Sequence, residues 1–311
     1  MTKKRLTYIA VLPTAVTLIN AFCGFLSIVY ASRGTGVFLK SFLLIKAETS
    51  FFAMAGYMVI LAMLADILDG QVARWSGTAS SFGGQLDSLA DVLSFGAAPA
   101  FLMFKVMEAR LGLEAAARNF FFPLSLWKAF PKSVSPQLAH LAGRWTLFVA
   151  IIFLLCAVIR LARFNVENDE DMASHQFFAG LPSPAAAGVV VSMVIFQEDF
   201  LTGLTRRLPG LASSLTDVTN WLFPFAVLGC GILMVSRVRY VHLANKILHG
   251  KKNFTTALLV LFTVFLAVWK LELALILGFW GFAATGLVRA AAGLFKRKNR
   301  PKNGVSPKPA A

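Results

Sequence analysis

The sequence predicts an all-α protein, a polytopic membrane bundle of about eight transmembrane helices. Hydrophobic residues make up 57% of the 311 positions and charged residues only 14%, with a mean hydropathy of +0.70. A water-soluble domain of this length carries more charge. A helix that crosses a bilayer needs about 20 apolar residues, and runs of that length lie at roughly 8–30, 49–68, 88–107, 143–162, 182–198, 219–236, 254–270 and 272–293.

Polar and basic segments separate these runs. The first run follows three basic residues as in a signal peptide, but it is too long and has no small-residue cleavage site, so we expect it to stay as the first span. Only residues 270–272 divide the last two runs, so six or seven spans are the alternatives. We expect a six-helix core with its loops in 1–240, an interfacial aromatic insert at about 108–142, further C-terminal helices in 241–295 and a basic disordered tail in 296–311.

The basic residues indicate how the chain lies in the membrane. The net charge of +15 gathers at the ends of apolar runs and in the tail, without the interleaved aromatic residues of a nucleic-acid groove. We interpret it as topology signals and contacts to anionic lipid headgroups. With eight spans, most basic clusters fall on one side, which places both termini and the loop after the second span in the cytoplasm. Arg118, Lys128 and Lys132 do not fit this pattern.

Acidic residues concentrate between the second and third runs. If these segments are helical, their residues form two stripes, each on one face of its helix. The first stripe is Asp66, Asp69, Gly70, Ala73 and Arg74, and the second is Gly83, Asp87 and Asp91. The segment between the stripes is rich in Gly, Ser and Thr, which favours a turn and an antiparallel pair of helices. Four carboxylates would then converge.

Carboxylates gathered in this way repel one another unless cations neutralise them. Oxygen ligands suit Mg²⁺, Mn²⁺ or Ca²⁺, and two such ions can act together on a phosphoryl group. The small residues leave the backbone bare for a nucleotide or phosphate, and Arg74 offers a fork for a phosphate oxygen. Alternatively, Asp66 and Asp69 cap a helix and the glycines only form turns, but caps do not explain the second stripe.

The pattern Asp66-x-x-Asp69-Gly70-x-x-Ala73-Arg74, then eight residues, then Gly83-x-x-x-Asp87-x-x-x-Asp91, resembles the signature of the CDP-alcohol phosphatidyltransferase family at every position. The resemblance implies a membrane enzyme that transfers a substituted phosphate from a CDP-linked donor to an alcohol and releases CMP. It implies two metal ions held by Asp66, Asp69, Asp87 and Asp91, and a donor bound by Asp66, Gly70, Ala73, Arg74 and Gly83. We further expect Asp91 to be the general base.

Other stretches resemble the branch of that family that uses serine as the acceptor. They are Ser94–Ala100, Arg160–Asn165 and Gly180–Gly188, together with Asn20, Cys23 and Gly24 in the first span. Thr14 departs from the branch, which has an asparagine there, so we assign it no nucleotide contact. Asn20 is either a nucleotide contact or a hydrogen bond between helices, and the sequence leaves both open.

Two arginines stand at the end of the fourth run. Arg160 and Arg163 either anchor the span at the membrane surface or bind a substrate carboxylate or lipid phosphate. Asn165 is suited to an amine or hydroxyl. We expect the binding role for Arg163 and Asn165, and the sequence does not separate Arg160 from Arg163.

Two neighbouring features have simpler interpretations. The acidic run Glu167–Asp171 is expected to form a solvated loop, and Pro182 and Pro184 to shape the start of the fifth span. The four histidines are scattered without metal-ligand spacing, so none is expected to bind a metal.

Together these interpretations predict an enzyme of a bacterial inner membrane that moves the phosphatidyl group of CDP-diacylglycerol to L-serine. Two divalent cations, Mg²⁺ or Mn²⁺ with Ca²⁺ as an alternative, would assist a direct displacement. The expected partners are both substrates, membrane lipids and a second copy of the chain in a homodimer, but not nucleic acid. The alternatives are another acceptor (glycerol 3-phosphate, inositol or choline) or a divalent-cation transporter, since aspartates inside a membrane also line ion paths.

Overall fold

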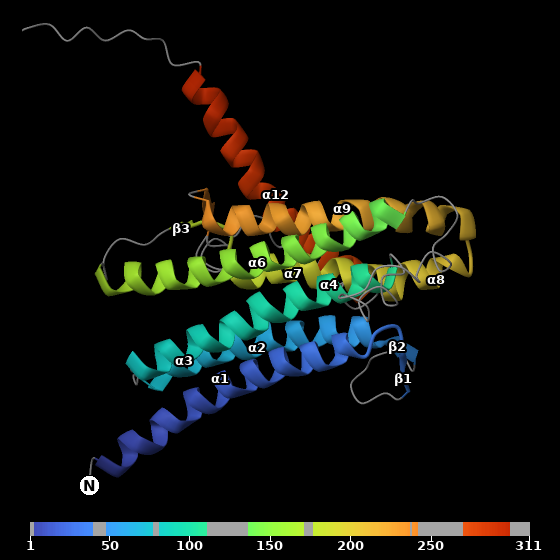
Figure 1. Ribbon diagram of the computed structural model, residues 1–311. Coiled ribbons are helices and arrows are strands. Elements are labelled where there is room, and N and C mark those ends of the chain that lie inside the picture. Colours follow the sequence, from blue (N-terminus) through green and yellow to red (C-terminus); the bar gives the residue numbers. More distant parts are fainter. Residues whose placement is uncertain are drawn as a thin grey trace, which may run out of the picture.

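The computed structural model describes residues 3–39, 48–76, 81–110, 136–170, 177–236, 238–241 and 270–298, and this part of the chain is mostly helical (Figure 1). Six of the described helices are long and apolar enough to cross a membrane. They are Thr14–Ser32, Phe51–Val72, Phe82–Arg110, Leu141–Val166, Ser183–Thr205 and Pro209–Val235. The chain is therefore an integral membrane protein.

Several spans combine more than one helical element. In chain order the helices are α1 (Lys3–Ser32), α2 (Phe51–Ser76), α3 (Ser81–Asp91), η1 (Val92–Ala97), α4 (Ala98–Arg110), α6 (Pro136–Glu170), α7 (Ser183–Ile195), η3 (Phe196–Leu201), α8 (Thr202–Thr205), α9 (Pro209–Val235) and α12 (Leu271–Lys298). The π-helical turns η1 and η3 lie inside the third and fifth spans. A π-turn inside a longer helix often marks a functional position.

The first six predicted apolar runs each coincide with one of these spans. The seventh, 254–270, lies outside the described residues except for Lys270. The eighth coincides with α12, whose apolar part Leu271–Gly286 is shorter than a span. The 108–142 insert is described only at its ends, which belong to α4 and α6, and the tail only at residues 296–298, which belong to α12.

Helix α7 lies at the centre of the bundle. It contacts α2, α4, α9 and α12, while α1, α2, α3 and α4 lie together on one side of it and α6 and α9 on the other (Figure 1). Most of its residues are small or β-branched, and every residue from Ala186 to Ile195 is buried. A helix that is apolar all round has no lipid-facing or solvent-facing side to prefer, so it takes the interior position.

Helix α12 packs closely against this central helix at Gly188. The Phe279 ring lies so close to Gly188 that a Cβ there would stand 2.2 Å from the ring carbons. Beyond this contact, the C-terminal half of α12 projects away from the bundle (Figure 1).

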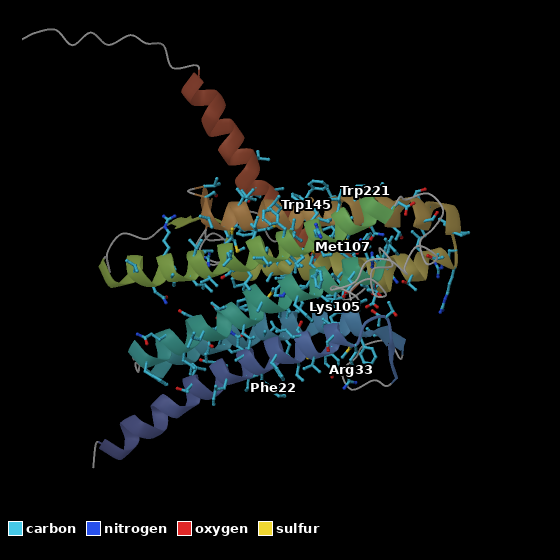
Figure 2. All side chains as sticks on the ribbon, viewed as in Figure 1. Phe22, Arg33, Lys105, Met107, Trp145 and Trp221 are labelled. Atoms are coloured by element: carbon cyan, nitrogen blue, oxygen red, sulfur yellow. The ribbon has the colours of Figure 1, made fainter. Side chains whose placement is uncertain are left out.

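Large apolar side chains also cover the outside of the bundle. Phe22 on α1 is 59% exposed and Trp221 on α9 is 74% exposed, and Figure 2 shows them on opposite outer faces. Such surfaces suit contact with acyl chains, as the composition requires of a membrane protein.

Short strands modify the all-α prediction. Two antiparallel pairs, β1 (Val37–Leu39) with β2 (Glu48–Ser50) and β3 (Phe177–Ala179) with β4 (Arg239–Val241), join the ends of spans. Extended chain at a helix end has free backbone groups, and pairing satisfies them. Gly180 follows β3 with a φ of 90°, and a Cβ there would lie 2.3 Å from the Met234 carbonyl oxygen, so only glycine fits.

The helix ends near this hairpin confirm one prediction and correct another. Pro182 occupies the N-cap position of α7 and Pro184 lies in its first turn. The predicted acidic loop Glu167–Asp171 is wrong as far as Glu170, because α6 remains helical to that residue. Glutamate is a good helix former, so the helix extends beyond its apolar part.

Polar contacts tie the helices together at the other end of α2. The Tyr57 hydroxyl donates to Asp199 Oδ2 at 2.7 Å. Arg110 bonds Glu198 Oε1 at 2.7 Å and donates to Asn220 Oδ1 at 2.6 Å. These contacts join α2 to η3 and α4 to η3 and α9, so the charged groups of Asp199, Glu198 and Arg110 each have a partner.

Candidate active site

Three of the four predicted aspartates come together where α2 and α3 meet. Asp66 and Asp69 lie on α2 and Asp87 lies on α3, and the three residues each offer a carboxylate oxygen within 4.8 Å of the others. α2 leads to the end of the bundle at which α3 begins, and the third span runs back beside it (Figure 1). Of the two predicted stripes, these three aspartates are the members that the cluster contains.

The carboxylates are largely removed from solvent. Asp69 is 7% exposed and Asp91 is 9% exposed, while Asp66 and Asp87 are half-buried. Asp69 Oδ2 and Asp87 Oδ1 are buried without a hydrogen-bond partner among the described residues. Burying carboxylate oxygens without partners is costly, so these oxygens fit a bound cation.

Helix α1 supplies hydrogen bonds that the aspartate pattern does not reveal. The Thr17 hydroxyl bonds the Asp69 carboxylate. Asn20 Nδ2 donates to Asp91 Oδ1 at 3.1 Å, and Ser94 Oγ donates to Asn20 Oδ1 at 2.6 Å. Asn20 therefore makes the hydrogen bond between helices that was one of its two sequence interpretations. The i, i+3 spacing of Thr17 and Asn20 was the available signal, since it places both on one face.

The approach of α1 to the site depends on Gly24. A Cβ on Gly24 would lie 2.7 Å from the Ser94 Cα and 2.8 Å from its Cβ. Ser94 belongs to η1, which begins directly after Asp91. The missing side chain thus brings the α1 backbone against η1, one helical turn from the Asn20 contact.

A sequence profile of CDP-alcohol phosphatidyltransferases matches residues 10–228. The chain belongs to the CDP-alcohol phosphatidyltransferase family. This family uses divalent metals, and the aspartate cluster of this phosphatidyltransferase could bind a metal.

Curated relatives cover most of the chain. It is 32% identical over 256 residues to the CDP-diacylglycerol–serine O-phosphatidyltransferase of Helicobacter pylori, with 81% of each chain aligned. It is 30% identical over 232 residues to the protein of that name in Saccharomyces cerevisiae, covering 71% of this chain and 67% of the relative. It is 28% identical over 242 residues to archaetidylserine synthase of Methanothermobacter thermautotrophicus, covering 77% and 73%.

The structure describes the surroundings of Gly70 and Gly83, two small residues of the phosphatidyltransferase signature. Gly70 lies beside the aspartates on α2, and a Cβ there would meet nothing within 4 Å, so the helix surface is open. Gly83 lies in the first turn of α3 and is half-buried. Ala73 and Arg74 belong to α2, but their side chains lie outside the described part.

The structure distinguishes the environments of Arg160 and Arg163 on α6. Arg160 is half-buried, and its Nη1 donates to the Ser183 hydroxyl at 2.9 Å at the start of α7. Its charge acts on the Asp91 carboxylate, and its buried Nε has no partner among the described residues. Arg163, one turn further along, is half-buried. Arg160 therefore interacts electrostatically with one of the aspartates.

Asn165 lies further along the same helix. Its Nδ2 donates to Ser88 Oγ at 2.9 Å, and the Ser88 hydroxyl lies 3.0 Å from the Gly84 carbonyl oxygen, to which it can donate. The contact ties the end of α6 to α3 next to Asp87. Asn165 is exposed, so its position also allows contact with a ligand.

Proposed function

We propose that this phosphatidyltransferase moves the phosphatidyl group of CDP-diacylglycerol to L-serine, giving phosphatidylserine and CMP. The observation that carries the proposal is the convergence of Asp66, Asp69 and Asp87, whose oxygens include buried ones without a partner in the described part of the chain. The choice of serine is supported by the names of the relatives in Helicobacter pylori and Saccharomyces cerevisiae.

Two divalent cations, Mg²⁺ or Mn²⁺ with Ca²⁺ as an alternative, are the proposed cofactors. Asp66, Asp69 and Asp87 would hold them, and Asp91 would complete the site. Hard carboxylate oxygens are the ligands that these ions prefer. When bound, they would supply positive charge against the phosphoryl oxygens and the CMP leaving group.

The donor is proposed to lie on the open surface of α2. Gly70 leaves room for close approach, and Ala73, Arg74 and Gly83 are the further proposed contacts, with Asp66 near the nucleotide. The acyl chains would remain among the spans, so the phosphorus next to diacylglycerol stands beside the aspartates.

Asp91 is the proposed general base. Its carboxylate takes the proton of the serine hydroxyl as the serine oxygen forms a bond to the phosphorus next to diacylglycerol. The bond between that phosphorus and the oxygen of CMP breaks, and CMP leaves. Direct displacement requires no covalent enzyme intermediate.

The acceptor is proposed to bind between α3 and α6. Arg160 faces Asp91 and would bind the serine carboxylate, since a guanidinium pairs well with a carboxylate. Arg163 and Asn165 are the remaining proposed contacts, to a lipid phosphate and to the serine amine.

A CMP-release assay tests the function. Purified full-length protein in mixed micelles with CDP-diacylglycerol should release CMP when serine is the sole acceptor, and a chelator should stop the release. Release with glycerol 3-phosphate, inositol or choline in place of serine would refute the acceptor. Metal flux into liposomes without CMP release would indicate a transporter instead.

Two variants test the roles of the aspartates. Asp91→Asn should lower turnover by about 10²–10⁴, the usual contribution of a general base, while CDP-diacylglycerol binding persists. Asp69→Ala should lose metal-dependent nucleotide binding. Near-normal turnover by Asp91→Asn would show that the base is another group.

We also propose the arrangement of the chain in a bacterial inner membrane. Eight spans would place the aspartates and both termini in or facing the cytoplasm, with the catalytic domain in 1–240, extra helices in 241–295 and a basic disordered tail in 296–311. The proposed assembly is a homodimer. Reporter fusions at the C-terminus and cross-linking in native membranes test these points.

A further inference from the structure

We propose that Asn20, held by Ser94, is a positioning residue that orients the Asp91 carboxylate for proton transfer. The inference rests on the proposed role of Asp91 as the base. It concerns a hydrogen-bond chain that crosses from α1 to the third span inside the bundle. Asn20 and Ser94 are both 0% exposed, so neither side chain exchanges its partner for water.

The chemistry of the three groups gives the chain a fixed direction. An ionised carboxylate only accepts hydrogen bonds, so the Asn20 amide must turn its NH₂ group toward Asp91. The amide oxygen then faces Ser94 Oγ, and it can only accept. Ser94 must therefore donate to Asn20, although its hydroxyl also lies 2.6 Å from the Ala90 carbonyl oxygen.

This chain defines what each oxygen of Asp91 does. Oδ1 is bonded to Asn20, which fixes the plane of the carboxylate and directs the other oxygen to the acceptor hydroxyl. Without Asn20, the negative charges of Asp66 and Asp87 would push on a carboxylate that can rotate. A base displaced by about 1 Å can lose a factor of about 10² in rate.

The position of Asn20 also argues against direct contact with the nucleotide. Both polar atoms of its amide are occupied by protein groups, and its side chain is fully buried between α1 and the third span. Its removal should therefore change the rate of the chemical step and leave donor binding intact.

The test compares Asn20→Leu, of similar size without the amide, with Ser94→Ala in the full-length protein. We expect kcat to fall about 10–100-fold for Asn20→Leu and less for Ser94→Ala. The KM for CDP-diacylglycerol and the Mn²⁺ affinity measured by electron paramagnetic resonance should stay within about twofold. Ser192→Ala is the matched control, because this buried serine on α7 donates to the Val189 backbone carbonyl within its own helix, and the kcat of this variant should not change.

A double variant decides whether Asn20 acts through Asp91. If it does, Asn20→Leu combined with Asp91→Asn should be no slower than Asp91→Asn alone. The proposal would be overturned if the losses in kcat of the two single variants multiply in the double variant. A raised KM for CDP-diacylglycerol with unchanged kcat in Asn20→Leu would also overturn it. If Asn20→Leu does not fold, Ser94→Ala with the same measurements decides, since it removes a single hydroxyl.

Failure of this inference can be told from failure of the proposed function. Normal kcat in Asn20→Leu together with an inactive Asp91→Asn would refute only the positioning role. Normal turnover in Asp91→Asn would remove the proposed base, and the positioning role with it.

Discussion

Replacing Gly24 with alanine should destabilise the fold, because α1 and η1 touch at this glycine. The new Cβ would lie 2.7 Å from the Ser94 Cα and 2.8 Å from its Cβ. Carbon atoms in favourable contact stand about 3.5–4.0 Å apart, so the two helices would have to separate by about 1 Å. No side-chain rotation relieves this contact, because the nearest atom belongs to the backbone.

The magnitude follows from two opposing effects. Over-packing typically costs about 1–3 kcal/mol, and a clash with backbone favours the upper end. Replacing a helical glycine with alanine returns about 1 kcal/mol. Gly24→Ala should therefore lose about 2 kcal/mol of stability. In the control Gly229→Ala on α9, the Cβ meets nothing within 4 Å, so only the gain of about 1 kcal/mol remains.

Reversible unfolding in mixed micelles with increasing dodecyl sulfate measures both free energies, and CMP release measures function. Gly24→Ala should also turn over more slowly, because a shifted α1 moves Thr17 and Asn20 away from the aspartates. Equal stability of the two variants would refute the close packing of α1 on η1. Lower stability with full turnover would refute the link between this packing and the site.

Three other changes have outcomes that the structure predicts. Gly188→Val should displace the Phe279 ring and release α12 from α7, which increased proteolysis of α12 would detect; Gly281→Val, with open space at its Cβ, is the control. Tyr57→Phe should lower the free energy of unfolding by about 1–3 kcal/mol, because the hydrogen bond from this hydroxyl to the Asp199 carboxylate is lost. In chelator, Asp69→Asn should melt at a higher temperature than the unchanged protein, because one repelling carboxylate is gone; added Mn²⁺ should reverse that order, because only the intact cluster gains binding energy. If Asp69→Asn and the unchanged protein melt at the same temperature both in chelator and with Mn²⁺, the result would count against a metal at Asp69.

The sequence was sufficient for the first six spans and for the meeting of three of the four aspartates, because both depend on local spacing. Apolar runs near 20 residues predict membrane helices in any context. The i, i+3 spacing of Asp66 with Asp69 and the i, i+4 spacing of Asp87 with Asp91 fix the helix face on which each pair lies. A short link between two helices then leaves an antiparallel pair as the simplest arrangement, and the carboxylates meet.

The role of α1 could not be predicted in the same way. Asn20 and Asp91 are 71 positions apart, and their contact depends on how closely α1 approaches η1. That approach depends on a glycine facing a serine in a π-helical turn, and neither residue reveals its partner. The sequence therefore showed a polar residue in a membrane span but not the group that it bonds.

The arginines of α6 illustrate a different limit. Arg160 and Arg163 are one turn apart and equally basic, so spacing gives them the same face. Their environments differ because α7 begins beside Arg160, where Ser183 receives its hydrogen bond. The hairpin of β3 with β4 and the left-handed Gly180 set that starting point, and such turns carry little signal in an apolar sequence.

The charge balance of the proposed site predicts two ions rather than one. If the four aspartates are ionised, they and the Arg160 guanidinium, whose charge acts on Asp91, together carry a net charge of −3. One divalent cation would leave −1 and still repel the doubly negative pyrophosphate of a CDP-linked donor. Two divalent cations would give the site a net charge of +1, which attracts the donor. After the reaction the negative charge of the pyrophosphate is divided between the two products, which favours release of CMP. Donor binding should therefore depend on metal concentration more steeply than a single ion allows.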